Sequence, residues 1–130
     1  MLSRPTNQDI APFQKKYTDL VPDDVMTFLV EQKDSFPEFI ETLSEELLDH
    51  TYEEGKWTLR EVIIHIIDTE VIFNYRTLAI ARGDSQALPG YDQDVYMNNG
   101  DFSKMNKEYL INYFNITTVS YTHLTLPTIA

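Results

Sequence analysis

The stretch from Trp57 to Gly83, WTLREVIIHIIDTEVIFNYRTLAIARG, constrains the fold more than any other part of the chain. Thr58 and Glu61 have the Thr-x-x-Glu spacing of a capping box, in which each side chain bonds the other residue's backbone amide. Trp57 and Val62 flank this box at the positions of a hydrophobic staple. Gly83 can take the left-handed conformation that often ends a helix. These signals predict one long helix that begins after Thr58 and stops at Gly83.

The apolar residues of this predicted helix are spread over most of its circumference. At 100° per residue, one face holds Val62, Ile66, Phe73, Thr77 and Ile80, and much of the other side holds Ile64, Ile67, Val71 and Leu78. A helix that is apolar nearly all round is covered on more than one side. We therefore expect this helix at the centre of a bundle.

Two more helices are predicted, one on each side of the long one. The earlier helix starts at Asp23 or Asp24, where an aspartate can accept free amide protons, and Pro37 is expected to kink or interrupt it. The later helix starts near Ser103 or Asn106. Both carry apolar residues three and four positions apart, and no segment alternates convincingly as a strand does. The chain is therefore predicted to be an all-α helical bundle.

The connecting segments are predicted to be irregular. Residues 4–22, ahead of the first helix, contain three prolines and are expected to form an extended arm. Residues 83–102 are rich in Gly, Asp and Asn and are expected to form a long loop with a turn at Pro89-Gly90. A loop of this length in a compact domain is often functional.

Charge and composition disfavour several classes of function. The formal net charge is −11, from 21 acidic and 10 basic residues, so binding to nucleic acid or to an anionic membrane surface is disfavoured. The absence of cysteine excludes disulfides, thiolate nucleophiles and cysteine zinc sites. No apolar run is long enough for a membrane span, and the first residues do not resemble a signal peptide. These features are typical of a cytoplasmic protein.

Residues 119–130 are predicted to be a non-native tail. The segment 119–128, VSYTHLTLPT, has no charged residue and matches the translation of a transposon-type sequencing adapter, a known contaminant of metagenomic reading frames. A genuine short C-terminal strand is the alternative. We therefore expect one domain in residues 1–118, with a natural sequence that continues past Thr118. His123 is given no functional weight.

His65 is the first candidate for a functional residue. It lies beside Thr69, Ile72 and Arg76 on the helical wheel, within a run of isoleucines and valines. An imidazole among apolar neighbours needs a partner, which can be a hydrogen-bond acceptor, a carboxylate or a metal ion. One imidazole does not hold a transition metal tightly, because such sites have three or four ligands. From the residues alone, a structural histidine and a metal ligand both stay open. His50 is expected to be exposed in a loop.

Carboxylates supply the other candidates. Glu70 falls within the apolar arc of the helix, where it must be paired, hydrogen-bonded or protonated. An ion-pair network is the simpler interpretation, because Arg76 and Arg82 can reach the neighbouring helices or the loop, and a catalytic carboxylate is the alternative. Asp92 and Asp94 suggest a calcium site only weakly, because the other residues of the EF-hand pattern are missing.

Several motifs together resemble those of the DinB/YfiT-like family of small bacterial helical bundles. They are the Gly-Lys-Trp-Thr opening at residues 55–58, the His-x-x-Asp-Thr-Glu centre at 65–70, the Arg-Gly-Asp helix end at 82–84 and the Pro-Gly-Tyr-Asp-Gln-Asp loop at 89–94. The similarity covers most of residues 10–116. It implies an up-down four-helix bundle, of which this chain holds about three helices and lacks the fourth.

The resemblance also implies a divalent metal, nickel or zinc, bound by three histidines. His65 matches the histidine of the family's second helix. The other two form a His-x-x-x-His pair on the fourth helix, which this chain does not have. Asp68 or Glu70 is expected to orient His65 or a neighbouring group. The chain is therefore not expected to bind the metal tightly.

The function implied by the resemblance is that of a metal-dependent enzyme acting on a small-molecule electrophile. It is a hydrolase, or a transferase that uses a low-molecular-weight thiol, and its metal lowers the pKa of a bound water or thiol. The family leans towards homodimers. This truncated chain is expected to be inactive, and its catalytic residues are not assigned. The alternative is a non-catalytic bundle that binds a small ligand or a protein partner, with His65 as a structural core residue.

Overall fold

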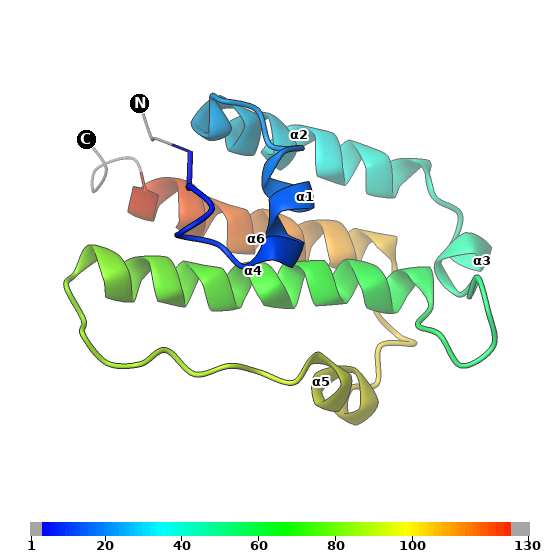
Figure 1. Cartoon of the computed structure of the whole chain (residues 1–130). Coiled ribbons are helices and arrows are strands. Elements are labelled where there is room, and N and C mark those ends of the chain that lie inside the picture. Colours follow the sequence, from blue (N-terminus) through cyan, green and yellow to red (C-terminus); the bar gives the residue numbers. More distant parts are fainter. Residues whose placement is uncertain (1–3, 126–130) are drawn as a thin grey trace. The chain divides into compact units, whose positions relative to one another are not determined.

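The computed structural model describes residues 4–125, with side chains for residues 4–119. Within this range every regular element is a helix. The long helices are α2 (Val25–Thr42), α4 (Leu59–Ala81) and α6 (Lys107–Thr125). The short ones are η1 (Pro12–Gln14), α1 (Lys15–Thr18), α3 (Glu45–Leu48) and α5 (Gln93–Asn99). The predicted all-α fold is therefore confirmed, and Figure 1 shows these helices in chain order.

The chain divides into two compact units, residues 1–35 and residues 36–130, and α2 begins in the first and ends in the second. The arm ahead of α2 is not wholly extended as predicted, because it contains η1 and α1. Pro12 opens η1, where its missing amide proton is no loss. Asp24 starts α2 as predicted, since its Oδ1 accepts a bond of 3.1 Å from the amide three residues on. A kink or an interruption is predicted at Pro37, and the helix continues through this residue without an interruption.

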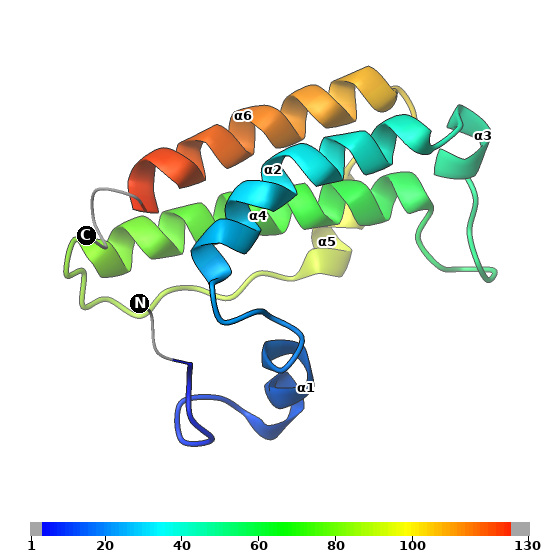
Figure 2. The same ribbon diagram turned by 90° about the horizontal axis from the view of Figure 1, so that it is seen from above.

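The second unit has one apolar core to which all of its helices contribute. Its buried residues are Ile40, Leu43, Leu48, Ile63, Ile64, Ile67, Met97, Leu110 and Phe114. Phe36 of α2 packs on Phe114 of α6 with ring centroids 4.7 Å apart. Figure 2 shows the last turns of α2 beside α4 and α6. Burying one such side chain contributes roughly 1.5–3 kcal/mol, so this core is the main source of the unit's stability.

Helices α4 and α6 lie side by side and run in the same direction (Figure 1). The hydrogen-bonded pairs occur in the same order along both helices. Asp68 of α4 bonds Tyr113 of α6, and more than one turn later in α4 Asn74 bonds the Thr117 carbonyl, one turn later in α6. Parallel neighbours need a long crossover, and the segment between α4 and α6 supplies it. The helices therefore do not alternate strictly up and down, as the expected bundle would.

Both predicted ends of α4 are confirmed. Thr58 Oγ1 accepts a bond of 3.2 Å from the Glu61 amide, and Glu61 Oε2 accepts one of 2.7 Å from the Thr58 amide. At the other end, Gly83 has a φ of +73°, which is the left-handed conformation that glycine adopts without strain. The Asp84 amide then bonds the Ala79 carbonyl at 2.9 Å. The capping signals in the sequence therefore correspond to real caps.

The predicted loop of residues 83–102 contains a helix of its own, α5. Asp92 begins this helix, because its Oδ1 accepts bonds from the amides of Asp94 and Val95 at 3.0 and 3.2 Å. Gly100 follows its last residue. An aspartate at this position is a capping signal that the Gly-rich and Asn-rich composition obscured. The Asp92 carboxylate is therefore used as a helix cap.

Helix α6 begins where predicted and continues into the segment interpreted as a tail. Asn106 starts it by accepting a bond of 2.9 Å from the Tyr109 amide. The backbone stays helical to Thr125, so the described part of residues 119–130 contains no strand. Residues 126–130 lie outside the described residues. The non-native origin of the tail, and the domain boundary at residue 118, stay predictions.

Helix α4 is predicted to be covered on more than one side, but the described residues do not cover it in that way. Its buried residues are Arg60, Ile63, Ile64, Ile67, Asn74 and Ala79. Val62, Ile66, Phe73 and Ile80, which share one of the predicted apolar faces, are 36%, 42%, 52% and 69% exposed. The described chain therefore covers α4 mainly on one side. Although α4 is apolar nearly all round, none of the described helices is long and apolar enough to cross a membrane.

Arg60 ties the start of α4 to two other segments, and it is only 4% exposed. Its guanidinium donates to Asp49 Oδ1 at 3.0 Å, to Glu45 Oε2 at 3.2 Å and to the Met105 carbonyl. Glu45 Oε1 also accepts a bond of 3.0 Å from the Lys107 amide. This cluster joins α3, α4 and the start of α6, and it holds both ends of the loop between α3 and α4.

The capping box of α4 can be tested by substitution. Thr58→Ala removes the hydroxyl that satisfies the Glu61 amide, so the free energy of unfolding should fall by about 1 kcal/mol. Thr58→Ser keeps the hydroxyl and is the matched control. Urea unfolding followed by circular dichroism measures both variants. A serine variant as unstable as the alanine variant would show that the methyl group, not the cap, matters at this position.

Candidate metal-ligand site

His65 lies on the side of α4 that faces away from the core. It stands two residues before the buried Ile67, which corresponds to a rotation of about 200° round the helix. The side chain is half-buried, and its ring packs against the indole of Trp57 with centroids 5.2 Å apart and planes tilted by 54°. Trp57 in turn packs against the apolar core. The indole therefore lies between the imidazole and the apolar core.

The buried ring nitrogen of His65 has no partner among the described residues. Its Nδ1 is inaccessible to solvent, and none of the described residues forms a hydrogen bond with it. A buried polar atom that is left unpaired costs about 1–3 kcal/mol. The described residues therefore do not make His65 a hydrogen-bonded core histidine. No residue in this part of the chain satisfies the hydrogen-bonding capacity of this nitrogen.

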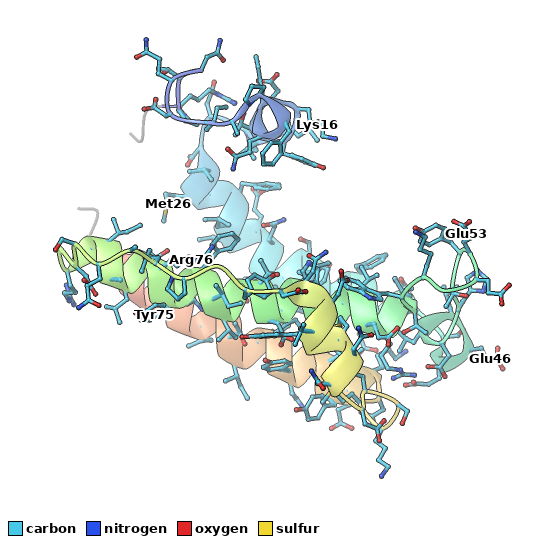
Figure 3. The ribbon with its side chains drawn as sticks, turned by 60° about the horizontal axis from the view of Figure 1, so that its bottom comes forward. Lys16, Met26, Glu46, Glu53, Tyr75 and Arg76 are labelled. Atoms are coloured by element: carbon cyan, nitrogen blue, oxygen red, sulfur yellow. The ribbon has the colours of Figure 1, made fainter. Side chains whose placement is uncertain are left out.

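The segment that leads from α4 to α5 runs along the same side of the helix. Thr69, one turn after His65, shares a hydrogen bond of 2.5 Å with the Tyr91 hydroxyl. Arg76 Nη2 donates to the Pro89 carbonyl at 2.7 Å, which confirms the predicted reach of this arginine to the loop. Figure 3 shows Arg76 where the segment passes α4. These two bonds hold the segment against the side of α4 on which His65 lies.

The two carboxylates expected to orient His65 bond to α6 instead. Asp68 Oδ1 accepts a bond of 2.9 Å from the Tyr113 hydroxyl. Glu70 Oε1 accepts one of 3.1 Å from the Thr118 hydroxyl. Neither carboxylate bonds the imidazole in the described chain, and the predicted ion pair between Glu70 and an arginine is not formed there. Both carboxylates therefore join α4 to α6.

These surroundings shift two pKa values. Burial raises the pKa of Glu70 above its ordinary value, and the bond from Thr118 offsets part of that rise. Burial, together with the bond to the Asp68 carboxylate, raises the pKa of Tyr113 to about 12. Tyr113 therefore keeps its proton at neutral pH and remains a hydrogen-bond donor to Asp68. The position of Glu70 favours its neutral form.

The described residues do not complete a metal site around His65. No three His, Cys, Asp or Glu side chains within this range come close enough together to hold a metal ion. His50 is exposed in its loop, as predicted, and the side chain of His123 lies outside the described residues. One imidazole can supply one metal ligand, whereas a metal site needs three or four ligands.

Trp57 and Tyr91 are neighbours of the site that the sequence did not predict. The sequence assigns Trp57 only to the hydrophobic staple. Trp57 precedes the extended cap residue Thr58, so helical periodicity does not predict the direction of its ring. Tyr91 also had no signal, because its bond to Thr69 depends on the path of a long connection.

Comparison with known proteins gives a family and a relative. A family model described as the DinB superfamily matches residues 29–119, which is more than half of the chain. The chain is also 32% identical over 59 residues to a protein of Oceanobacillus iheyensis named "Putative metal-dependent hydrolase". That alignment covers 45% of this chain and 34% of the relative, so it spans about a third of the relative's length. No solved structure matches the chain.

The raised pKa of Glu70 predicts a pH-dependent effect of Glu70→Gln. The folded protein holds this proton more readily than the unfolded chain does. The stability contributed by protonated Glu70 is therefore fully present below its ordinary pKa of 4.5 and is lost as the pH rises through the folded-state pKa. Glutamine is neutral at every pH. The free energy of unfolding of the variant, relative to the parent, should thus increase as the pH rises above 4.5.

Urea unfolding at a series of pH values measures this difference. Glu53→Gln is the matched control, since Glu53 is exposed at the outer end of its loop (Figure 3). A difference that stays flat with pH for Glu70→Gln, or an equal trend in both variants, would contradict the assignment.

Proposed function

Because the chain belongs to the DinB superfamily, we propose that it derives from a metal-dependent enzyme that acts on a small molecule, with His65 as one metal ligand. The proposed reaction is hydrolysis, or the transfer of a low-molecular-weight thiol to an electrophile. The unpartnered buried nitrogen of His65 is the observation that carries this proposal. The name of the Oceanobacillus relative, which describes metal-dependent hydrolysis, supports it.

The surroundings of His65 suit a ligand role. A neutral imidazole with a free nitrogen is a good ligand for nickel or zinc. Bound at a site with an open position, such a metal lowers the pKa of a water or thiol and so supplies a nucleophile. Packing against Trp57 restricts rotation of the His65 ring before any metal binds. A ligand held in place in this way loses less conformational entropy on binding.

We propose that the remaining ligands belong to natural sequence that follows residue 118, in place of residues 119–130. Two histidines four residues apart on a helix lie on one face, so a His-x-x-x-His pair would complete a three-histidine site with His65. The present chain would then bind metal weakly and be inactive. The intact protein is proposed to be a cytoplasmic homodimer that does not act on nucleic acid or membranes.

A metal titration tests His65 directly. Trp57 is the single tryptophan of the chain, and its ring lies 5.2 Å from the imidazole. Ni²⁺ bound to His65 should therefore quench the tryptophan fluorescence in a weak but saturable way. His65→Ala should abolish the saturable part, because it removes the imidazole that packs against the indole. Circular dichroism checks that each variant stays helical.

The matched control for this titration is His50→Ala, which removes an exposed histidine from the preceding loop. It should leave the quenching unchanged. If His65→Ala is quenched as strongly as the parent, His65 is not a ligand.

The uninterrupted reading frame from the source genome provides a second test. It should encode a His-x-x-x-His helix after residue 118, and the full protein should retain about one Ni²⁺ or Zn²⁺ per chain after dialysis. His65→Ala should remove this stoichiometric metal. Elemental analysis measures both. A frame without further ligands would favour the alternative function, a non-catalytic bundle that binds a ligand or a protein partner.

A further inference from the structure

We propose that a cavity beside Trp57 binds a small zwitterion with an aromatic or apolar body, of the kind that free amino acids and their derivatives present. The cavity has a volume of about 380 Å³, which falls within the range of small-molecule sites. The side chains that line it are Tyr52, Lys56, Trp57, Val62, Gln93 and Asp94. They come from the loop before α4, from the first turn of α4 and from the start of α5.

Three of the six side chains that line this cavity are aromatic or apolar. Tyr52 and Trp57 offer two ring surfaces, and Val62 adds an aliphatic one. Gly55, with a φ of +76°, makes the turn that precedes Lys56 and Trp57 in the lining. Aromatic side chains give a large contact area for an apolar ligand at a small entropy cost. The body of the ligand is therefore expected to be apolar or aromatic.

Two charged side chains of opposite sign complete the lining. Among the described residues of this unit, ion pairs are made by Arg60 and Lys107, and neither Lys56 nor Asp94 takes part in one. The Lys56 ammonium and the Asp94 carboxylate also have no side-chain hydrogen bond in the described chain. Gln93 adds one amide donor and one acceptor. The polar part of the lining thus offers one cation, one anion and one amide.

These charges favour a zwitterion over a simple acid or amine. A ligand carboxylate can pair with Lys56, and a ligand ammonium can pair with Asp94. A plain carboxylate would also be repelled by the formal net charge of −11, whereas a zwitterion has no net charge and is not. Both charged groups of the ligand are therefore used, and the ligand as a whole carries no net charge for the rest of the protein to repel.

The cavity and His65 share the Trp57 side chain. The zwitterion is proposed as the substrate class of the His65 site, and this assignment rests on the proposed function. Binding of the zwitterion itself needs no metal. It can therefore be measured on the metal-free chain, and the two proposals can fail separately.

The experiment uses the single tryptophan as the reporter. Metal-free protein is titrated with L-phenylalanine, which has both charges, with L-phenylalaninamide, which lacks the carboxylate, and with 3-phenylpropionate, which lacks the ammonium. All three carry the same phenyl group and do not absorb where tryptophan alone is excited. L-Phenylalanine should change the Trp57 emission saturably and bind roughly tenfold more tightly than either analogue, because each lost charge removes one charged hydrogen bond.

Two variants assign the charges. Lys56→Gln should remove the preference for L-phenylalanine over its amide, and Asp94→Asn should remove the preference over 3-phenylpropionate. Lys104→Gln, which changes an exposed lysine outside the cavity, is the matched control and should keep both preferences.

Three outcomes would overturn the proposal: no saturable change with L-phenylalanine, equal affinity for the three probes, or preferences that survive both cavity variants. Loss of Ni²⁺ quenching together with retained L-phenylalanine binding would remove the metal proposal and leave this one standing. The reverse result would remove this one alone.

Discussion

The geometry of the second unit depends on the hydrogen bonds of the buried Arg60 guanidinium. A charge at this depth stabilises a fold only when its donors are used, and here Nε, Nη1 and Nη2 all have acceptors. Its partners lie in α3, just after α3 and just before α6. Arg60 therefore determines where the loop that ends in Trp57 can lie. Trp57 then packs against His65 and lines the cavity, so one cluster positions both proposed sites without belonging to either.

The parts of the fold that could be predicted from the sequence are those controlled by local contacts. Asp24, Thr58 and Asn106 each accept a bond from an amide three residues later, and a reader of the sequence can recognise that spacing. The parallel direction of α6 depends on contacts between residues more than 40 positions apart, such as that of Asp68 with Tyr113. The burial of Arg60 likewise depends on a residue far away in the sequence, because its guanidinium donates to the Met105 carbonyl. A helix that is apolar nearly all round also has no single apolar side that could identify its buried face.

The candidate site likewise has a part that could be predicted from the sequence and a part that could not. His65 was identified because an imidazole within an apolar run is unusual at the level of sequence. Asp68 or Glu70 is predicted to orient His65 or a neighbouring group, but the five residues from His65 to Glu70 turn a helix by about 500°, which leaves these two side chains some 140° apart. Glu70 accordingly reaches α6 and bonds Thr118. Angular position, rather than distance along the chain, decides which helical residues can act together.

One requirement would explain several features of α4 at once. Val62 and Ile66 lie on either side of His65 in the sequence and are exposed, and the nitrogen that has no partner among the described residues belongs to the same stretch of helix. Covering apolar surface contributes about 25 cal/mol per Å², and it also lowers the local dielectric constant, which strengthens the bond between a metal and its ligands. Under the proposed function, a single helix with two histidines four residues apart could bury these apolar residues and direct both imidazoles towards His65. The exposed apolar residues and the nitrogen of His65 would then have the same explanation, since one helix would cover the former and complete the metal site around His65.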